Sequence, residues 1–318
     1  MNGASVYVGG FSYELGELEY AVEDLEEIKE FPEKVSRLKS SGFSRYRTSK
    51  LSVLDLAGKS INKLFSKVDI APESIDAVIF ATSSIGVNNH LSHRFLCDFL
   101  LEHGLHNAYP LMSSLSFCGN LMPAFKKGYN YILSGEYKHI LLIVADIVSE
   151  EFGRIAPPDL AVGSDAAASC LLSVNPEVGF EISDIHESVN SQAGLYDPAR
   201  DFPRYVKAVS DGIRSVANKT LVATASPSQS VTRVFTNNYN EQTCKSYLRL
   251  LGLHQDKIDL SNISRFGHAG AADICINICD YLENHEQGDE ESFLLLSSGP
   301  FMWGSALIRP VKTPALSS

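Results

Sequence analysis

Short apolar runs alternate along the chain with stretches in which apolar residues return every three or four positions. The short runs predict buried strands, and the longer periodic stretches predict amphipathic helices. We expect strands at 77–81, 140–147 and 293–297, and helices at 51–65 and 91–103. The same pattern predicts further strands at 4–10, 234–235 and 304–309 and further helices at 205–223, 241–251 and 271–282. This alternation indicates an α/β protein.

Two neighbouring segments near the N-terminus differ sharply in charge. The segment 14–33 is acidic and has apolar residues at helical spacing, which predicts a helix with one solvated face. The segment 36–50 is rich in serine and basic residues. The middle of the chain, 175–230, shows the weakest periodicity, and we expect a loop at 190–204.

The composition is that of an ordinary globular protein, with 318 residues, 44% of them hydrophobic and 20% charged. The net charge of −11 argues against a broad surface for nucleic acid or anionic membranes. No apolar run reaches the roughly 18 residues of a membrane-spanning helix. The first ten residues lack the pattern of a secretory signal. Together these features predict a cytoplasmic protein without nucleic-acid or membrane partners.

The six cysteines are scattered through mostly apolar segments, which is typical of reduced thiols in the cytoplasm. Cys275 and Cys279 lie one helical turn apart, but no nearby His or Cys pair completes a zinc set. We therefore expect free thiols and no metal centre.

One of these cysteines, Cys118, lies beside Gly119 between an apolar run that begins at Tyr109 and a predicted helix. A second apolar run then ends at Ile147, so the segment reads as strand, turn, helix and strand. Free N–H groups and the dipole at a helix N-terminus stabilise a thiolate. Cys118 is therefore a candidate nucleophile, and a buried core cysteine is the competing interpretation.

The two halves of the chain repeat the same order of elements. The segment DAVIFATSS with its helix corresponds to VTRVFTNN with its helix, and ILLIVADI corresponds to FLLLSS. The helix after Cys118 corresponds to the helix after His268, and AAASCLLS corresponds to WGSALIRP. We infer a duplicated α/β unit about a pseudo-twofold axis, with halves 1–174 and 175–318. Cys118, Asn237 and His268 would all follow the carboxyl ends of strands, where functional groups gather in such sheets.

Five segments carry a resemblance to a known family. They are SSLSFCGNLMPAF at 113–125, VGSDAAASCLL at 162–172, TNNYN at 236–240, RFGHAGAAD at 265–273 and SSGPFMWGSALIRP at 297–310. In this order they resemble motifs of the thiolase superfamily and, within it, β-ketoacyl-acyl carrier protein synthase III. The resemblance implies a thiolase-like fold of duplicated α/β halves layered αβαβα.

The chain departs from the family at two of its catalytic positions. Asn237 occupies the position of the family's catalytic histidine, and His268 occupies the position of its catalytic asparagine. One interpretation is that both loops reach the same thioester, so that each side chain takes part of the other's role. The alternative is a homologue that has lost its activity, because a fold alone does not guarantee a function.

The resemblance implies acyl transfer through Cys118, with His268 and Asn237 as the other catalytic residues. The backbone N–H groups of Cys118 and Gly299 would form the oxyanion hole. A helix N-terminus lowers an imidazole pKa, so we expect a neutral His268 that acts as base or donor. The resemblance also places Gly299, Asn89 and Phe301 against the substrate.

The expected activity is that of an acyltransferase of the EC 2.3.1 type, most simply a decarboxylative Claisen condensation in a specialised biosynthetic pathway. Acyl transfer to oxygen, nitrogen or a carrier thiol is the close alternative, and an inactive subunit of a heterodimeric synthase is the second. No cofactor is expected, since the substrate is a thioester of coenzyme A or an acyl carrier protein. The adenine-binding aromatic and basic pair of the family is absent.

An acyl carrier protein is the expected macromolecular partner, and the family suggests a homodimer. Basic residues that could meet an acidic carrier are Lys39, Arg45, Arg47, Lys126 and Lys127. Each is individually an ordinary surface charge.

Overall fold

The computed structural model describes residues 5–84, 92–149, 151, 153–157, 159–197, 200–226, 228–286, 288 and 290–311. No described helix combines the length and the apolar character that crossing a membrane requires. All six cysteines are free thiols, as predicted.

Nine strands form one sheet that consists of two half-sheets. The strands are β1 (Tyr7–Leu15), β4 (Ala77–Ala81), β5 (Tyr109–Ser113), β6 (His139–Asp146), β9 (Ala166–Ser173), β10 (Gly179–Val189), β11 (Arg233–Thr236), β12 (Phe293–Ser298) and β13 (Met302–Pro310). Their order is β11-β12-β13-β10-β1-β9-β6-β4-β5. Only three residue pairs, from Tyr7↔Glu181 to Gly9↔Gly179, join β1 to β10. This short junction lets the two half-sheets turn toward each other.

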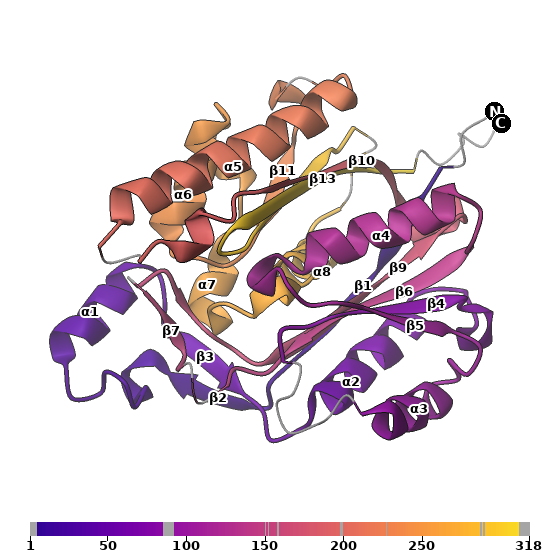
Figure 1. Ribbon diagram of the computed structural model, residues 1–318, viewed down its shortest axis with the longest axis horizontal. Helices are drawn as coiled ribbons and strands as arrows, with labels where there is room; N and C mark the ends of the chain where they lie inside the picture. Colours follow the sequence, from indigo (N-terminus) through magenta and orange to yellow (C-terminus); the bar gives the residue numbers. More distant parts are fainter. Residues whose placement is uncertain are drawn as a thin grey trace.

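Eight α-helices in the described residues pack against these half-sheets. They are α1 (Pro32–Ser40), α2 (Val53–Phe65), α3 (His93–Glu102), α4 (Leu121–Leu133), α5 (Phe202–Ala223), α6 (Glu241–Leu250), α7 (Ser261–Phe266) and α8 (Asp273–Asn284). Figure 1 shows α4 and α8 between the half-sheets, with α5 and α6 on one outer side and α2 and α3 on the other. The arrangement gives five layers, αβαβα, and confirms the predicted fold class.

The period of two along the strands explains these layers. In β12, Phe293 and Leu295 belong to the central core around α4 and α8, whereas Leu294 and Leu296 pack with α5 and α6. In β4, Ile79 likewise faces the central core, while its neighbours face α2 and α3. Both faces of these strands are buried, so their sequences are continuous apolar runs rather than alternating ones.

The repeat seen in the sequence corresponds to the topology of the sheet. Strands β4, β6 and β9 occupy the places in the first half-sheet that β11, β12 and β13 occupy in the second. Helices α4 and α8 precede β6 and β12 in the two halves. The division predicted at 174/175 lies in the connection between β9 and β10, and the assignment of each half as a domain stays a prediction.

The acidic segment 14–33 is not the predicted helix. Strand β2 (Leu18–Ala21) pairs there with β3 (Arg45–Thr48), and Glu19 forms ion pairs with both Arg45 and Arg47 across the ribbon. Opposite charges on neighbouring strands stabilise such a pair. The acidic and basic segments thus each contribute one strand to a two-stranded ribbon. The spacing of apolar residues within one segment does not reveal this pairing, because the partner strand lies in the other segment.

Strand β10 and helix α7 were not predicted. Nine of the 11 residues of β10 pair with β13, and the register shifts between Ile182 and Asp184. Such a bulge interrupts the strict alternation of buried and exposed residues by which a strand is recognised. Strand β5 also differs from the expected buried strand, because it is the last strand of the sheet and Tyr109 is 60% exposed.

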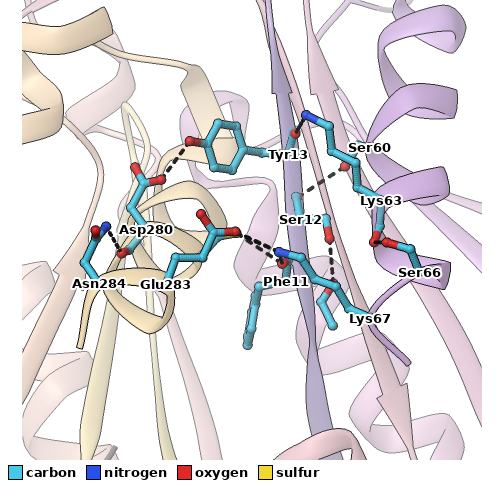
Figure 2. A network of polar contacts seen from close by, with 12 residues as sticks. Phe11, Ser12, Tyr13, Ser60, Lys63, Ser66, Lys67, Asp280, Glu283 and Asn284 are labelled. Atoms are coloured by element: carbon cyan, nitrogen blue, oxygen red, sulfur yellow. Dashed lines mark hydrogen bonds and ion pairs between the residues drawn. The ribbon is translucent and has the colours of Figure 1, made fainter. Parts of the chain in front are cut away.

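A polar network fixes the C-terminal end of α8 to β1 and α2 (Figure 2). Tyr13 on β1 donates its hydroxyl to Asp280 at 2.7 Å. The ammonium of Lys67 lies 3.1 Å from the carbonyl oxygen of Phe11 and 3.0 Å from the carboxylate of Glu283. The network therefore anchors the helix whose opposite end enters the candidate site.

Candidate active site

Cys118 lies in a tight turn, Phe117–Gly119, between β5 and α4. Phe117 has a φ of 50°, in the left-handed region that non-glycine residues rarely adopt. Asn120 holds the turn: its Oδ1 accepts the N–H of Ser116 at 2.8 Å, and its Nδ2 donates to Ser83 Oγ at 3.0 Å. The side chain of Cys118 thus lies on a rigid turn just before the N-terminus of α4.

The imidazole of His268 faces the Cys118 sulfur, with Nε2 3.0 Å from Sγ. The backbone of His268 is fixed on both sides, since its N–H donates to Val162 O and its carbonyl accepts the N–H of Ser164, both at 2.8 Å. Gly267, directly before it, has a φ of 72°. A Cβ on Gly267 would lie 2.5 Å from Val162 O, so only glycine fits this turn.

The other ring nitrogen of His268 contacts a carboxylate that the sequence reasoning did not identify. Nδ1 lies 2.5 Å from Asp273 Oδ2, and the side chain of Asp273 is fully buried. The carboxylate also accepts the backbone N–H groups of Ala269 at 2.7 Å and Asn238 at 2.8 Å. Asp273 is the first residue of α8, where the helix dipole favours a negative charge. The signal in the sequence was an acid five residues after the histidine, at a predicted helix start.

The pKa of His268 differs from the sequence prediction. Burial alone lowers it, but the negative charges of Cys118 and Asp273 outweigh burial and hold it well above its ordinary value. The predicted neutral imidazole is therefore wrong for the resting site. The geometry instead favours an imidazolium between a thiolate and a carboxylate, as in cysteine nucleophiles that a neighbouring histidine activates.

Asn237 differs from its expected role as a donor to the substrate. Its Nδ2 donates to two backbone carbonyls, those of Cys118 and Gly270, each at 3.0 Å. Its Oδ1 accepts the N–H of Ser298 at 2.9 Å. Because an amide has two N–H hydrogens, both are used. In this arrangement Asn237 joins three turns of the site and leaves no N–H for a bound thioester.

Gly299 also differs from its expected role. Its backbone N–H donates to Met302 O at 2.8 Å, inside the turn between β12 and β13, and so does not point at a substrate oxygen. Within the described residues, the N–H of Cys118 has no backbone acceptor. Cys118 is therefore the remaining backbone donor of the predicted oxyanion hole.

A cavity of about 860 Å³ opens beside the sulfur and the imidazole. Its walls include Ser83, Ser84, Phe117, Cys118, Asp146, Ile147, Val148, Ser149, Glu151, Gly153, Arg154, Ile155, Ala156, Pro157, Ala161, Gly163, Ser164, His268, Gly270 and Pro300. Phe301, predicted to contact the substrate, is not among them and lies against Gly194. Asn89, the other predicted contact, lies outside the described residues. This volume is in the range of ligand-binding sites.

Four of the five basic residues considered for carrier docking lie beside carboxylates. Lys39 contacts Glu23, both Arg45 and Arg47 contact Glu19, and Lys126 lies 3.6 Å from Glu187. The fifth, Lys127, donates to the carbonyl oxygen of Met112. These pairs reduce the positive field that an acidic carrier would meet.

Comparison with known proteins agrees with the predicted fold. A family model described as the C-terminal part of 3-oxoacyl-[acyl-carrier-protein] synthase III matches residues 221–310. The β-ketoacyl-[acyl-carrier-protein] synthase III of Staphylococcus haemolyticus is 24% identical over 288 residues, covering 86% of this chain and 89% of the relative.

Two solved structures show the same fold along almost the whole chain. The 3-oxoacyl-[acyl-carrier-protein] synthase III of Aquifex aeolicus has a TM-score of 0.81 at 18% identity, covering 96% of this chain and 99% of that one. A protein described as ChlB3, an acyltransferase, has a TM-score of 0.82 at 15% identity, covering 99% and 100%. The chain thus has the fold of these synthases and is similar, over most of its length, to proteins named β-ketoacyl-[acyl-carrier-protein] synthase III.

Proposed function

We propose that the protein transfers acyl groups from thioesters through an acyl-enzyme on Cys118. The observation that carries the proposal is the continuous contact from Cys118 through His268 to Asp273, the first two of which line one cavity. A nucleophile, a base at hydrogen-bond distance and a third group that orients the base are the parts that covalent acyl transfer needs.

The two half-reactions follow from this arrangement. The Cys118 thiolate attacks the thioester carbonyl, and the imidazolium of His268 gives its proton to the departing thiol. The neutral imidazole then takes a proton from the acceptor as the acceptor attacks the acyl-enzyme. This step restores the thiolate and the imidazolium. Asp273 stabilises the imidazolium and keeps Nε2 directed at the sulfur, and the N–H of Cys118 binds the oxyanion.

For the second half-reaction, the geometry favours an oxygen or nitrogen acceptor. Decarboxylation of a malonyl thioester develops an enolate, which the sequence prediction assigned to two donors, His268 and Asn237. Both N–H groups of Asn237 already bind backbone carbonyls, so one donor of that pair is missing in this arrangement. Attack by a hydroxyl or an amine needs a base and an oxyanion donor only.

Decarboxylative condensation is the second candidate. It is favoured by the 24% identity, over most of the chain, to a relative named β-ketoacyl-[acyl-carrier-protein] synthase III. The two candidates share the acyl-enzyme and differ in the acceptor. A thioester of an acyl carrier protein is the proposed donor in both, with coenzyme A thioesters as the alternative. The protein is proposed to act as a homodimer that pairs through the exposed edge of β5.

The test is intact-protein mass spectrometry after incubation with acetyl thioesters of coenzyme A and of an acyl carrier protein. We expect one acyl mass, which Cys118→Ala abolishes and Cys97→Ala retains, because Cys97 is an exposed thiol remote in sequence from the site. The absence of any acyl mass with either donor would refute the proposal and favour the inactive subunit. Release of carbon dioxide from a malonyl carrier by the acylated protein would assign condensation.

A further inference from the structure

A buried carboxyl group, distinct from that of Asp273, lines the cavity and has no part in the contacts described so far. Asp146 is the last residue of β6, and it shares the cavity wall with Cys118 and His268. Its position at the carboxyl end of a central strand is where α/β sheets place functional groups.

One oxygen of this carboxyl group is held firmly in place. Oδ1 accepts the backbone N–H of Ser83 at 2.5 Å, and the hydroxyls of Thr82 and Ser84 lie 3.2 Å and 3.3 Å from it. All three donors belong to the segment that follows β4, the neighbouring strand. The carboxyl therefore keeps a fixed orientation.

The other oxygen faces open space at the site. Among the described residues, the three hydrogen bonds given above all reach Oδ1, and the carboxyl group of Asp146 forms no ion pair. Oδ2 lies 3.2 Å from where a Cβ on Gly270 would be, two residues after His268. Gly270 has a φ of 62°, so this position stays free of a side chain. The absence of a Cβ leaves room for a ligand atom beside Oδ2.

The carboxyl group is buried from bulk solvent but lines the cavity, and burial raises its pKa to about 6 against the hydrogen bonds from Thr82, Ser83 and Ser84 that lower it. At neutral pH it is therefore mostly ionised. Two described side chains in the cavity wall can be cationic, and both already have carboxylate partners: the His268 imidazolium contacts Asp273, and Arg154 binds Asp165 with both of its terminal nitrogens. The ionisable groups around the cavity are Cys118, Asp146, Glu151, Arg154 and His268.

Burial of an anion costs free energy unless a positively charged group pairs with it. The cavity holds two proton acceptors, the Asp146 carboxylate and the His268 imidazole of the acyl-enzyme. A primary amine that arrives as an ammonium ion must lose two protons when it becomes an amide, one before attack and one during it. A hydroxyl acceptor must lose only one. The cavity thus holds two bases for the two protons that an ammonium ion loses, and one of these bases is an anion that can bind the ammonium charge.

Resting on the proposed acyl-enzyme, we propose that the acceptor is a primary amine and that Asp146 binds its ammonium form. Oδ2 takes the first proton, the free amine attacks the thioester carbon, and His268 takes the second proton as the C–N bond forms. The C–S bond then breaks, which leaves an amide, the Cys118 thiolate, an imidazolium and a neutral Asp146. Release of the Asp146 proton to solvent completes the cycle.

The test measures decay of the acetyl group on Cys118 after excess donor has been removed. Propylamine and propanol, at equal concentrations, serve as matched probes, and the product N-propylacetamide is measured with the loss of the acetyl mass. We expect propylamine to accelerate decay at least tenfold more than propanol does, after subtraction of the reaction of each probe with a free thioester. Asp146→Asn should lower the propylamine rate at least tenfold more than it lowers the acylation rate.

The matched control is Asp211→Asn, which removes a half-exposed carboxylate on α5 that is not part of the cavity wall and should leave the propylamine rate within twofold. The pH profile of that rate should fall below about pH 6 in the wild type and lose this limb in Asp146→Asn. Equal propylamine rates in the wild type and Asp146→Asn, or a propanol rate equal to that of propylamine, would overturn the inference. Either result leaves the acyl-enzyme itself intact, so the proposed function would survive.

Thermal unfolding, which does not depend on catalysis, tests whether the variant folds and whether Asp146 is ionised. The folded pKa of Asp146, about 6, lies above the ordinary value of 3.8, so the protonated carboxyl stabilises the fold. That stability is present at low pH and is lost as the pH rises through about 6. Asp146→Asn should therefore melt higher than the wild type at pH 8, and the difference should shrink toward pH 4. A variant that melts lower at pH 8 would contradict the placement of an ionised, unpartnered carboxylate.

Discussion

At the scale of single residues, the imidazole of His268 lies between two negative groups. The sulfur of Cys118 and the carboxyl group of Asp273 both contact it, and the residue is only 7% exposed. Tyr239 covers one side of it, with the ring centroids 5.2 Å apart. Because the carboxyl group of Asp273 accepts two backbone N–H groups besides its contact with the imidazole, its position is fixed.

Asp273→Asn should slow acylation of Cys118 by about 10²- to 10⁴-fold, the range seen when the orienting acid of a triad is neutralised. The pKa of His268 should also fall, since one of the charges that raise it is removed. The imidazolium that protonates the leaving thiol is then present only at lower pH. The pH optimum of acylation should therefore shift toward acid.

Acylation rates across pH, measured by intact mass, check this prediction. Asp256→Asn is a suitable control, because that carboxylate pairs with a histidine, His254, at the surface, where its side chain is 72% exposed. The control should keep the wild-type rate and optimum. Wild-type acylation in Asp273→Asn would remove Asp273 from the mechanism.

At the scale of elements, the side chains of Cys118 and His268 are positioned by turns rather than by the interior of helices or strands. Cys118 lies in the turn before α4, and His268 follows the turn at Gly267. Asn237 ties these two turns to a third through Cys118 O, Gly270 O and the N–H of Ser298. Its buried carboxamide is therefore a positioning group, and the distance between sulfur and imidazole depends on it.

Gly267→Ala should disturb the site more than an ordinary glycine replacement. The added Cβ would meet Val162 O at 2.5 Å, and the φ of 72° is already unfavourable for alanine. We expect a loss of about 2 kcal/mol or more in the free energy of unfolding and a large loss of Cys118 acylation.

Gly252→Ala provides the matched control. Gly252 has a similar φ of 66°, but no atom lies within 4 Å of an added Cβ. The free energy of unfolding of Gly252→Ala should fall only by the conformational cost of about 1 kcal/mol, and this variant should keep the wild-type acylation rate. Denaturant unfolding and acyl-mass formation measure both quantities. Equal behaviour of the two variants would show that the contact with Val162 does not position His268.

At the scale of the whole molecule, the five layers bring the ends of the central helices together. The N-terminal ends of α4 and α8 meet at Cys118 and Asp273, and each helix follows from one half of the duplicated fold. The network of Figure 2 holds α8 at its far end. The pseudo-twofold arrangement thus converts two sequence-distant segments into one site.

The exposed edge of β5 should mediate dimer formation. Its outer side has no strand partner among the described residues, and Tyr109 and Met112 are 60% and 42% exposed. An uncharged edge of this kind invites pairing with another strand. We expect light scattering to give twice the chain mass of 34.8 kDa.

The double variant Tyr109→Lys with Met112→Lys should shift the protein toward monomer, because like charges would face each other across the paired edges. Val222→Lys, at an apolar side chain that is 80% exposed on α5, is the control and should remain dimeric. A wild type that is monomeric, or a double variant that stays fully dimeric, would contradict the role of β5.

Local patterns in the sequence were sufficient for most of the architecture. Apolar runs predicted β4, β6 and β12, periodic stretches predicted α2, α5 and α6, and the repeated order predicted the duplication. These signals are local, because burial on both faces of a strand, or on one face of a helix, is visible within a few residues. The charged ribbon of β2 and β3 escaped prediction because its stabilising pairs join segments more than 20 residues apart.

The sequence by itself determined the fold and pointed to Cys118 and His268, since the order of its motifs indicates which turns follow which strands. The tertiary structure decided what each polar group does. It placed Asp273 behind His268, directed both N–H groups of Asn237 to backbone carbonyls and left Asp146 facing the cavity. Hydrogen bonds of this kind depend on which distant backbone atoms come within about 3 Å, and no local pattern encodes that distance.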